Sequence, residues 1–253
     1  MLDFVDVAGG VFDMGSTMDE VQQCVADWGS RLVDPAYDAD EFRRWILKEY
    51  PSRTVEIAPF RMTRFPIMND EYERFIVDTG RGRPESIECG EPADHPVWGV
   101  SFDDADAFAE WATEECGFRC AVPMEAQWEY AARGSSRRQY PFGDEFDAAA
   151  CNTIESGIGK TTPVDHYPNG ASPFGVLDMA GNVEEWTSSR YEPYPGGTFV
   201  EDHLSLTLGP HYRILRGGSF ARGGDLARCA RRHGPLMRPE FRFTGLRLVA
   251  SAS

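Results

Sequence analysis

The sequence predicts an α+β fold with little regular sheet, on three observations. Strand-like patterns come first, helical patterns follow, and the second half of the chain consists mostly of turns and short strands. Within that half, residues 181–189 and 213–220 are together rich in Gly, Asn, Ser and Trp, which suit tight, irregular backbone. No linker, repeat or low-complexity tract interrupts the 253 residues. We therefore expect one domain over residues 1–253, with a helical insertion at 17–50.

The first elements are expected to be short strands and the helices of the insertion. Two strands are predicted within residues 5–14, around the turn at Gly9 and Gly10. The insertion contains two helical patterns with Trp45 and Ile46 as apolar anchors. A further strand follows, because residues 54–57 alternate between polar and apolar.

Three helices are expected in the middle of the chain. Asn69 is a suitable N-cap for the first, and Gly80 terminates it. Ser101 caps the second, whose buried stripe runs from Ala105 to Ala112. The third covers 124–133 behind Pro123, with Trp128 facing inward. Turns dominate from 134 to 212, and the last strands are predicted at 214–215, 226–231 and 241–249.

The charge is strongly acidic but unevenly distributed. A net charge of −16 argues against a general nucleic-acid binder. Between Arg213 and Arg247, however, nine arginines stand against Asp225 and Glu240. The C-terminal third is therefore locally basic, which favours an anionic or carboxylate ligand there.

Nothing in the sequence indicates a membrane partner or a disulfide framework. The N-terminus lacks a basic segment followed by an apolar one, and no apolar run reaches transmembrane length. The six cysteines show no metal-like pairing, and Cys116 and Cys120 are separated by three residues rather than two. We therefore expect a cytoplasmic protein with reduced, mostly buried cysteines.

Seven motifs in order resemble the formylglycine-generating enzyme or sulfatase-modifying-factor superfamily. That superfamily includes the C-terminal domain of ergothioneine-type sulfoxide synthases, and residues 185–189 and 194–196 are most similar to this branch. The resemblance implies a variant C-type-lectin-like fold with a small twisted antiparallel sheet, two to three main helices and abundant structured loops. The motifs are Gly-Val-Phe-Asp-Met-Gly-Ser at 10–16, then 66–72, 95–101, 122–134, 181–189, 213–220 and Gly-Leu-Arg at 245–247.

The resemblance also implies structural calcium. In the family, a loop around the Gly-Asn-Val-x-Glu-Trp motif surrounds Ca²⁺ with hard oxygen ligands. In the alternative interpretation, the two carboxylates of this loop cap backbone N–H groups without a metal. The matching positions are the side chains of Asp178 and Glu185 and the carbonyls of Gly181 and Val183, with a second site at Asn152 and the carbonyl of Thr153.

Copper is not expected. The formylglycine-forming enzymes hold it through two cysteines shortly after the Arg-Gly-Gly-Ser-Phe motif, and thiolates are what Cu(I) requires. In this sequence Arg222 stands at the first thiolate position, and the second falls near Asp225. Cys229 matches a structural cysteine of the family. Formylglycine formation is therefore not expected either.

Iron is not expected, but the question stays open. Sulfoxide synthases take their iron histidines largely from a separate N-terminal helical domain that this sequence lacks. The insertion at 17–50 contains no histidine. His203, His211 and His233 flank the same C-terminal region and would have to converge to form a three-histidine site.

The C-terminal stretch 221–244 is expected to line a ligand groove. In the family the equivalent stretch lines the active groove, and in the variable proteins of diversity-generating retroelements it carries the ligand-binding residues. The alternative is that about half of its arginines serve strand pairing and loop salt bridges. The candidate contacts are Arg222, Asp225, Arg228, Arg231, Arg232, His233, Arg238, Phe241 and Phe243.

Two functions follow. The first is a calcium-stabilised lectin-like scaffold that binds a small molecule, peptide or protein through this Arg/aromatic groove. The alternative is an oxidoreductase or biosynthetic tailoring enzyme related to the non-haem iron sulfoxide synthases, with a metal site of its own or one completed by a partner subunit.

Overall fold

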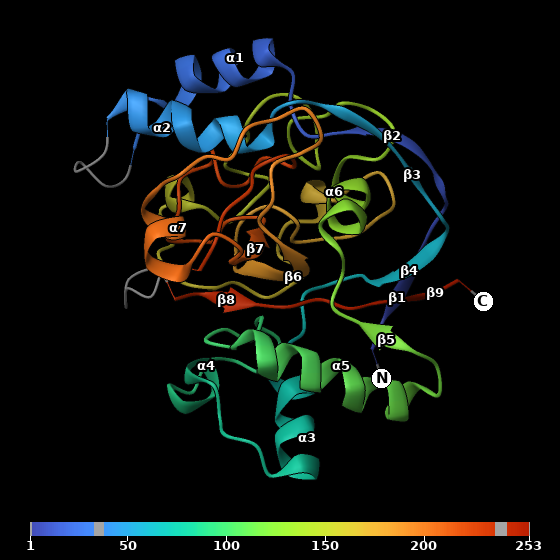
Figure 1. Ribbon diagram of the computed structural model, residues 1–253. Coiled ribbons are helices and arrows are strands. Elements are labelled where there is room, and N and C mark those ends of the chain that lie inside the picture. The colour runs from blue at the N-terminus through green and yellow to red at the C-terminus, as the bar shows by residue number, and fades with distance from the viewer. Residues whose placement is uncertain (1, 33–37, 236–241, 253) are drawn as a thin grey trace.

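The computed structural model describes residues 2–32, 38–235 and 242–252 (Figure 1). Three small sheets form its strand framework. The first is antiparallel, with the order β1 (Phe4–Val7), β4 (Phe60–Thr63), β9 (Val249–Ser251), β5 (Cys120–Ala121). The second pairs β2 (Gly10–Met14) with β3 (Arg53–Ile57). In the third, β6 (Glu184–Arg190) lies between antiparallel β7 (Arg213–Arg216) and parallel β8 (Thr244–Gly245).

The three expected central helices are present, and their apolar faces are buried. They are α3 (Asn69–Thr79), α5 (Phe102–Cys116) and α6 (Glu125–Arg133). Ser101 accepts a hydrogen bond from the amide of Asp104 and so caps α5, and Gly80 ends α3 with a positive φ. Trp128 is fully buried, as predicted. The structure also contains two short helices, α4 (Glu85–Glu88) and α7 (His203–Leu208), and the 3-10 turns η2 (Ile154–Ser156) and η3 (Pro168–Gly170).

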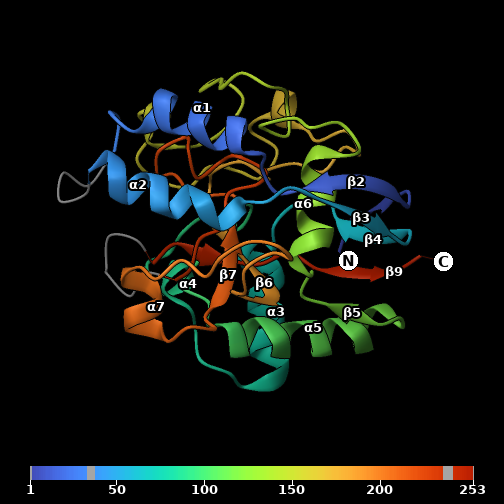
Figure 2. The ribbon, with the colours of Figure 1, turned by 45° about the horizontal axis from the view of Figure 1, so that its top comes forward.

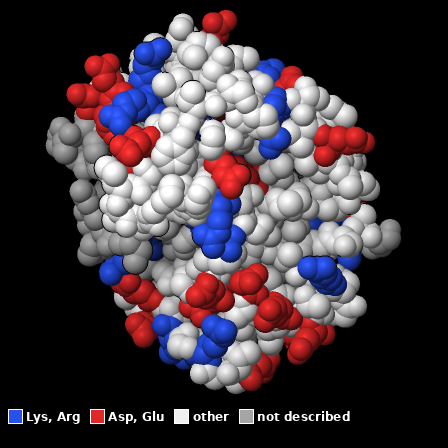
Figure 3. Space-filling view, viewed as in Figure 1, with Lys and Arg blue, Asp and Glu red and all other residues white. Residues whose placement is uncertain are grey.

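The helical insertion is also present. It consists of α1 (Met18–Trp28), α2 (Ala39–Ile46) and the 3-10 turn η1 (Leu47–Glu49). Thr17 begins α1 through a capping box with Glu20. Figures 1 and 2 show α1 and α2 at one side of the molecule and α3–α5 at the opposite end, where acidic side chains gather on the surface (Figure 3).

The insertion covers the C-terminal segment that precedes the last strands. The apolar faces of α1 and α2 pack in one cluster with Ala227. At Gly224 a side chain would have no room, because a Cβ there would lie 2.4 Å from Phe146 and 2.6 Å from Trp28. This close approach brings the insertion directly onto the stretch that the sequence marks as a ligand groove.

Three local predictions are wrong. The last strand, expected over 241–249, is divided among the described residues into β8 and β9, and residues 246–248 between them are not strand. Residues 226–231 form turns instead of a strand, since their amides bond to carbonyls three residues earlier in the chain and to the carbonyl of Gln139 instead of to a neighbouring strand. Asn69 is the first residue of α3 and Met68 precedes it as the cap. The Asn69 side chain instead donates to the carbonyl of Pro92 and accepts from the hydroxyl of Ser86.

The fold class is confirmed as α+β with small sheets, helices and long structured loops. All six cysteines are free thiols, four of them buried. Within the described residues, no helix is both long and apolar enough to cross a membrane.

Candidate functional site

Several C-terminal arginines lie inside the protein in tight ion pairs. Arg228 binds Glu49 of η1 through two nitrogens, at 3.1 and 2.8 Å. Arg232 binds Glu125 of α6 in the same way, at 2.7 and 3.1 Å. Both guanidinium groups are buried and their charges are matched. These contacts agree with the salt-bridge alternative for Arg228 and Arg232, whose role as ligand contacts stays a prediction.

A second group of charged residues contains longer ion pairs. We call Glu184, Arg222, Asp225, Arg231 and His233 the C-terminal cluster. Glu184 begins β6, and His233 pairs with Leu215 of β7 through the backbone. Arg231 Nη1 donates to the carbonyl of Arg232 at 2.7 Å. The ion pairs of the two arginines with described carboxylates are longer: Arg222 Nε lies 3.6 Å from Glu184 Oε2, and Arg231 Nε lies 3.5 Å from Asp225 Oδ2. These separations exceed an ordinary N–H···O hydrogen bond.

Burial and neighbouring charges set the protonation of this cluster. Burial opposes a charge on Glu184, but His233 and Arg222 outweigh it and hold the Glu184 pKa below its usual value. Burial lowers the pKa of His233 to about 4. Burial raises the pKa of Asp225 to about 6, although Arg231 and Arg228 act in the opposite direction. At neutral pH the cluster therefore holds an ionised Glu184 beside a neutral His233.

Polar atoms without a hydrogen-bond partner gather at this cluster. Within the described chain, Glu184 Oε2 and Arg231 Nε are buried and make no hydrogen bond, and the same holds for the hydroxyl of Ser219. Ser219 adjoins the cluster, because its carbonyl accepts the amide of Arg222. Most buried polar groups in proteins are hydrogen-bonded, so these atoms indicate a site for water or a ligand.

Three aromatic side chains, Trp98, Phe220 and Phe243, lie beside the cluster and are called the aromatic wall. The rings of Phe220 and Phe243 lie 4.3 Å apart, and that of Trp98 lies 5.0 Å from Phe243. The amide of Glu184 donates to the carbonyl of Phe243, which joins the wall to the cluster. The indole N–H of Trp98 is buried and has no acceptor among the described residues. Of the predicted ligand contacts, Arg238 and Phe241 lie outside the described residues.

Sequence reasoning missed Glu184, Ser219 and Trp98. A signal existed for the first, because the motif contains two adjacent glutamates at 184 and 185. Neighbouring residues of a strand point to opposite faces. Only one of the two glutamates can therefore face the C-terminal cluster, and the structure shows that it is Glu184.

The other glutamate, Glu185, belongs to a saturated network. Its two carboxylate oxygens accept hydrogen bonds from Arg247. Arg247 Nε donates to Oε2 at 2.6 Å, and Nη2 donates to Oε1 at 2.7 Å. The indole of Trp128 also donates to Oε2, at 2.6 Å. The carboxylate is thus already neutralised by a buried guanidinium. This donor set does not fit calcium at Asp178, Gly181, Val183 and Glu185, since one of its two carboxylates is occupied.

The second predicted calcium site does not fit the ion either. Asn152 Oδ1 accepts from the hydroxyl of Ser156, and the Thr153 carbonyl accepts the Ser156 amide. The side-chain Nδ2 of Asn152 donates to the carbonyl of Lys160 and to Oδ1 of Asn182. The nearby carboxylate of Glu155 is bound by the Thr153 hydroxyl and the Gly224 amide. Each of these side chains and the Thr153 carbonyl therefore already has a protein partner.

The residues present offer no redox-metal site of the family type. Cys229 lies in the apolar core, where burial raises its pKa to about 12. His95 is hydrogen-bonded to Thr161, and His203 packs against Trp45. Across residues 2–32, 38–235 and 242–252, no three His, Cys, Asp or Glu side chains are grouped closely enough to hold a metal ion.

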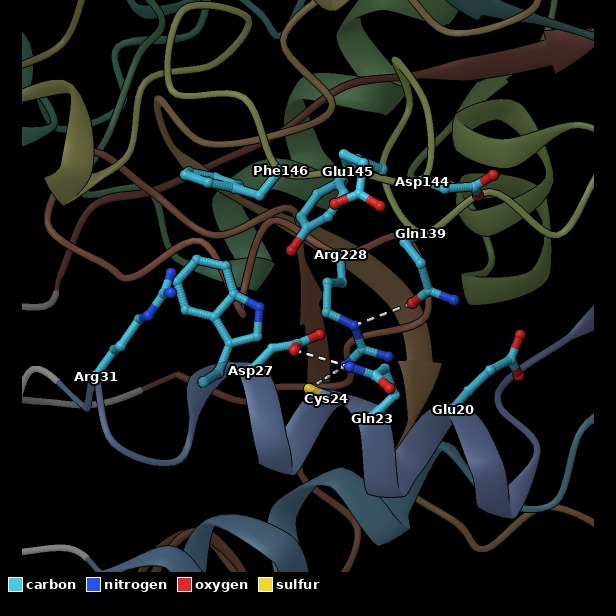
Figure 4. Close-up of a pocket in the computed structure, with 12 residues that line it drawn as sticks. Glu20, Gln23, Cys24, Asp27, Arg31, Gln139, Asp144, Glu145, Phe146 and Arg228 are labelled. Atoms are coloured by element: carbon cyan, nitrogen blue, oxygen red, sulfur yellow. Dashed lines mark hydrogen bonds between the residues drawn. The ribbon is translucent and has the colours of Figure 1, made fainter.

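A pocket of about 440 Å³ separates α1 from the loop around residues 139–146. Arg228 reaches into it from the C-terminal segment and contacts Gln139 and Cys24 (Figure 4). Its walls carry Trp28, Tyr140 and Phe146 and its rim carries exposed acids. No sequence motif marked this pocket, because it forms only where the insertion meets a distant loop.

Comparison with known proteins identifies the family to which the domain around this site belongs. The family described as "Sulfatase-modifying factor enzyme 1-like domain" matches residues 2–252. The chain belongs to this family. Hercynine oxygenase from Mycolicibacterium smegmatis is 33% identical over 243 residues, covering 79% of this chain and 55% of that protein. Formylglycine-generating enzyme from Streptomyces coelicolor is 38% identical over 162 residues, covering 54% and 46%.

Solved structures agree on the fold. PvdO from Pseudomonas aeruginosa superposes with a TM-score of 0.69 at 21% identity, covering 98% of this chain and 94% of that one. Treponema denticola variable protein 1 does so with a TM-score of 0.66 at 16% identity, covering 98% and 95%. The family and the C-type-lectin-like fold predicted from the seven motifs are thus confirmed. The chain spans about half the length of the curated relatives it matches.

Proposed function

We propose that this protein is an oxidoreductase or biosynthetic tailoring enzyme related to the non-haem iron sulfoxide synthases, and that its substrate binds at the C-terminal cluster. Similarity to hercynine oxygenases over most of the chain supports the class of reaction. The observation that carries the proposed site is the set of buried polar atoms without hydrogen-bond partners at Glu184, Ser219 and Arg231.

The chemistry of the cluster suits a small polar substrate with a negative group. Arg222 and Arg231 supply positive charge, and the long ion pair between Arg231 Nε and Asp225 leaves room for a shorter bond from this nitrogen to an anion. Glu184 Oε2 can accept a hydrogen bond from the same molecule. The rings of Trp98, Phe220 and Phe243 offer an apolar face on one side. An apolar face beside a few polar groups would orient such a ligand.

The described residues do not themselves form a redox-metal site, so we assign no iron or copper ligand to them. We propose that the metal is completed by a partner subunit or by a further part of a longer protein. The curated relatives are about twice the length of the matched region, which supports this division of the site between two parts.

A ligand-binding scaffold is the second candidate. The unpartnered atoms of the cluster require an occupant but do not require that the occupant react. Formylglycine formation is not part of the proposal, because Arg222 and Asp225 stand where the resemblance places the copper thiolates.

The two candidates are separated by metal content and oxygen consumption. The protein should be purified without chelator from the cells that make it, so that any partner subunit is retained. Mass spectrometry then measures iron and copper, and an oxygen electrode measures consumption with hercynine and a small thiol. We expect a stoichiometric redox metal and substrate-dependent oxygen uptake. Ligand binding without metal or oxygen uptake would support the scaffold instead.

A further inference from the structure

The Glu184–His233 pair is more rigid than the rest of the C-terminal cluster. His233 exchanges both backbone hydrogen bonds with Leu215, at 2.9 and 3.2 Å. Glu184 is held by β6 and by its amide bond to Phe243. Between these two fixed backbones, His233 Nδ1 lies 2.7 Å from Glu184 Oε1. The imidazole is therefore oriented by a short contact between two fixed backbones.

This contact determines which ring nitrogen carries hydrogen. An ionised carboxylate only accepts hydrogen bonds, so Nδ1 must be the donor. The neutral ring then keeps a lone pair on Nε2. The histidine side chain is 10% exposed and that of Glu184 only 1%, so the accessible part of the pair belongs to the imidazole. Within the described chain, the hydrogen bond to Glu184 is the one that the ring makes.

Burial and the charges around the ring keep it neutral at rest. Arg222 and Arg231 from the C-terminal segment oppose a positive ring, and burial acts in the same direction. Glu184 from β6 favours it. Asp225 faces Arg231 and offsets part of that charge. The resting ring is neutral, and the carboxylate is in place to stabilise an imidazolium once it forms.

We propose that His233 is the proton acceptor of this site, with Glu184 as its positioning residue. The inference rests on the proposed function, since it assumes that the substrate binds beside Arg222 and Arg231. In the step, an ionisable X–H bond of the bound substrate breaks and its electron pair stays on X. The proton forms a new bond to Nε2, which leaves an imidazolium against the Glu184 carboxylate.

The first test is independent of activity. Two-dimensional ¹H–¹⁵N NMR of the ¹⁵N-histidine-labelled protein reports the tautomer of each ring, and His233→Gln identifies the signal. We expect Nδ1–H with an unprotonated Nε2 at pH 7. Glu184→Gln should weaken this preference, whereas Glu91→Gln, beside His95, should leave it intact. A proton on Nε2, or an imidazolium at pH 7, would overturn the inference whatever the activity of the protein.

The second test uses turnover by the protein purified with its partner. His233→Gln should lower kcat by about 100-fold or more while KM changes much less, as expected for the loss of an acid–base group. Added imidazole should restore part of the rate in His233→Ala. Unchanged kcat in His233→Gln would refute the proton-acceptor role. If the unaltered protein shows no turnover while the NMR signature is present, it is the proposed function that fails.

Discussion

Two buried ionic regions of this protein are built from the same residue types but are paired differently. Around Glu185 and Arg247, two hydrogen bonds of 2.6 and 2.7 Å join the carboxylate to the guanidinium. In the C-terminal cluster, the ion pairs of Arg222 and Arg231 are 3.6 and 3.5 Å long, and several polar atoms have no hydrogen bond within the described chain. A saturated network holds the fold together, while an unsaturated one of equal burial has capacity left for a ligand.

The largest effect is expected in the saturated network. Arg247→Met should lower the free energy of unfolding by about 3–5 kcal/mol, because it leaves Glu185 as an uncompensated buried charge. Urea denaturation followed by circular dichroism measures this change. Arg83→Met is the matched control, since Arg83 pairs with Glu73 at the surface and should cost about 1 kcal/mol or less. Equal losses in the two variants would remove the distinction between the networks.

A smaller effect on stability is expected at the cluster. Arg231→Gln removes a guanidinium whose Nε has no hydrogen bond within the described chain and whose pairing with Asp225 is long. The same denaturation experiment should show a smaller loss than Arg247→Met, while substrate binding, measured by calorimetry, weakens at least tenfold. If Arg231→Gln lost as much stability as Arg247→Met and bound substrate unchanged, Arg231 would stabilise the fold and would not bind substrate.

The pH dependence of stability adds a third comparison. Burial raises the pKa of Asp178 to about 7. Because the folded protein then retains a proton that the unfolded chain has lost, stability falls as the pH rises from about 4 towards 7. Asp178→Asn keeps an acceptor for Asn182 and suits the positive φ of 55°. We expect this variant to flatten the pH profile of the melting temperature; a destabilised variant at pH 8 would indicate a metal-bound carboxylate.

The smallest effect is expected from chelation. Arg247 already neutralises Glu185, so EDTA followed by added Ca²⁺ should leave the melting temperature within about 1 °C. Differential scanning fluorimetry at low ionic strength is sufficient. A clear drop with EDTA that Ca²⁺ reverses would restore the calcium site predicted from the family motif.

The fold of this protein and its main helices could be predicted, because they depend on local sequence motifs. Gly80, Ser101 and Trp128 act locally as caps or core anchors, so their roles follow from sequence position alone. The charged site was less predictable. Arg228 finds its partner in Glu49, 179 residues away, and Arg231 finds Asp225 six residues away, yet both look alike in the sequence. Pairing across a fold depends on tertiary distance, which neither composition nor periodicity encodes.

The central claim is that Glu184 belongs to a substrate site and Glu125 to the structural network, although both are buried and face arginines. Glu184→Gln and Glu125→Gln should therefore be compared for melting temperature and substrate-dependent oxygen uptake, in protein purified so that any partner subunit is retained. We predict that Glu184→Gln keeps most of its melting temperature and loses oxygen uptake, while Glu125→Gln loses several degrees. Full oxygen uptake in a stable Glu184→Gln protein would contradict the account.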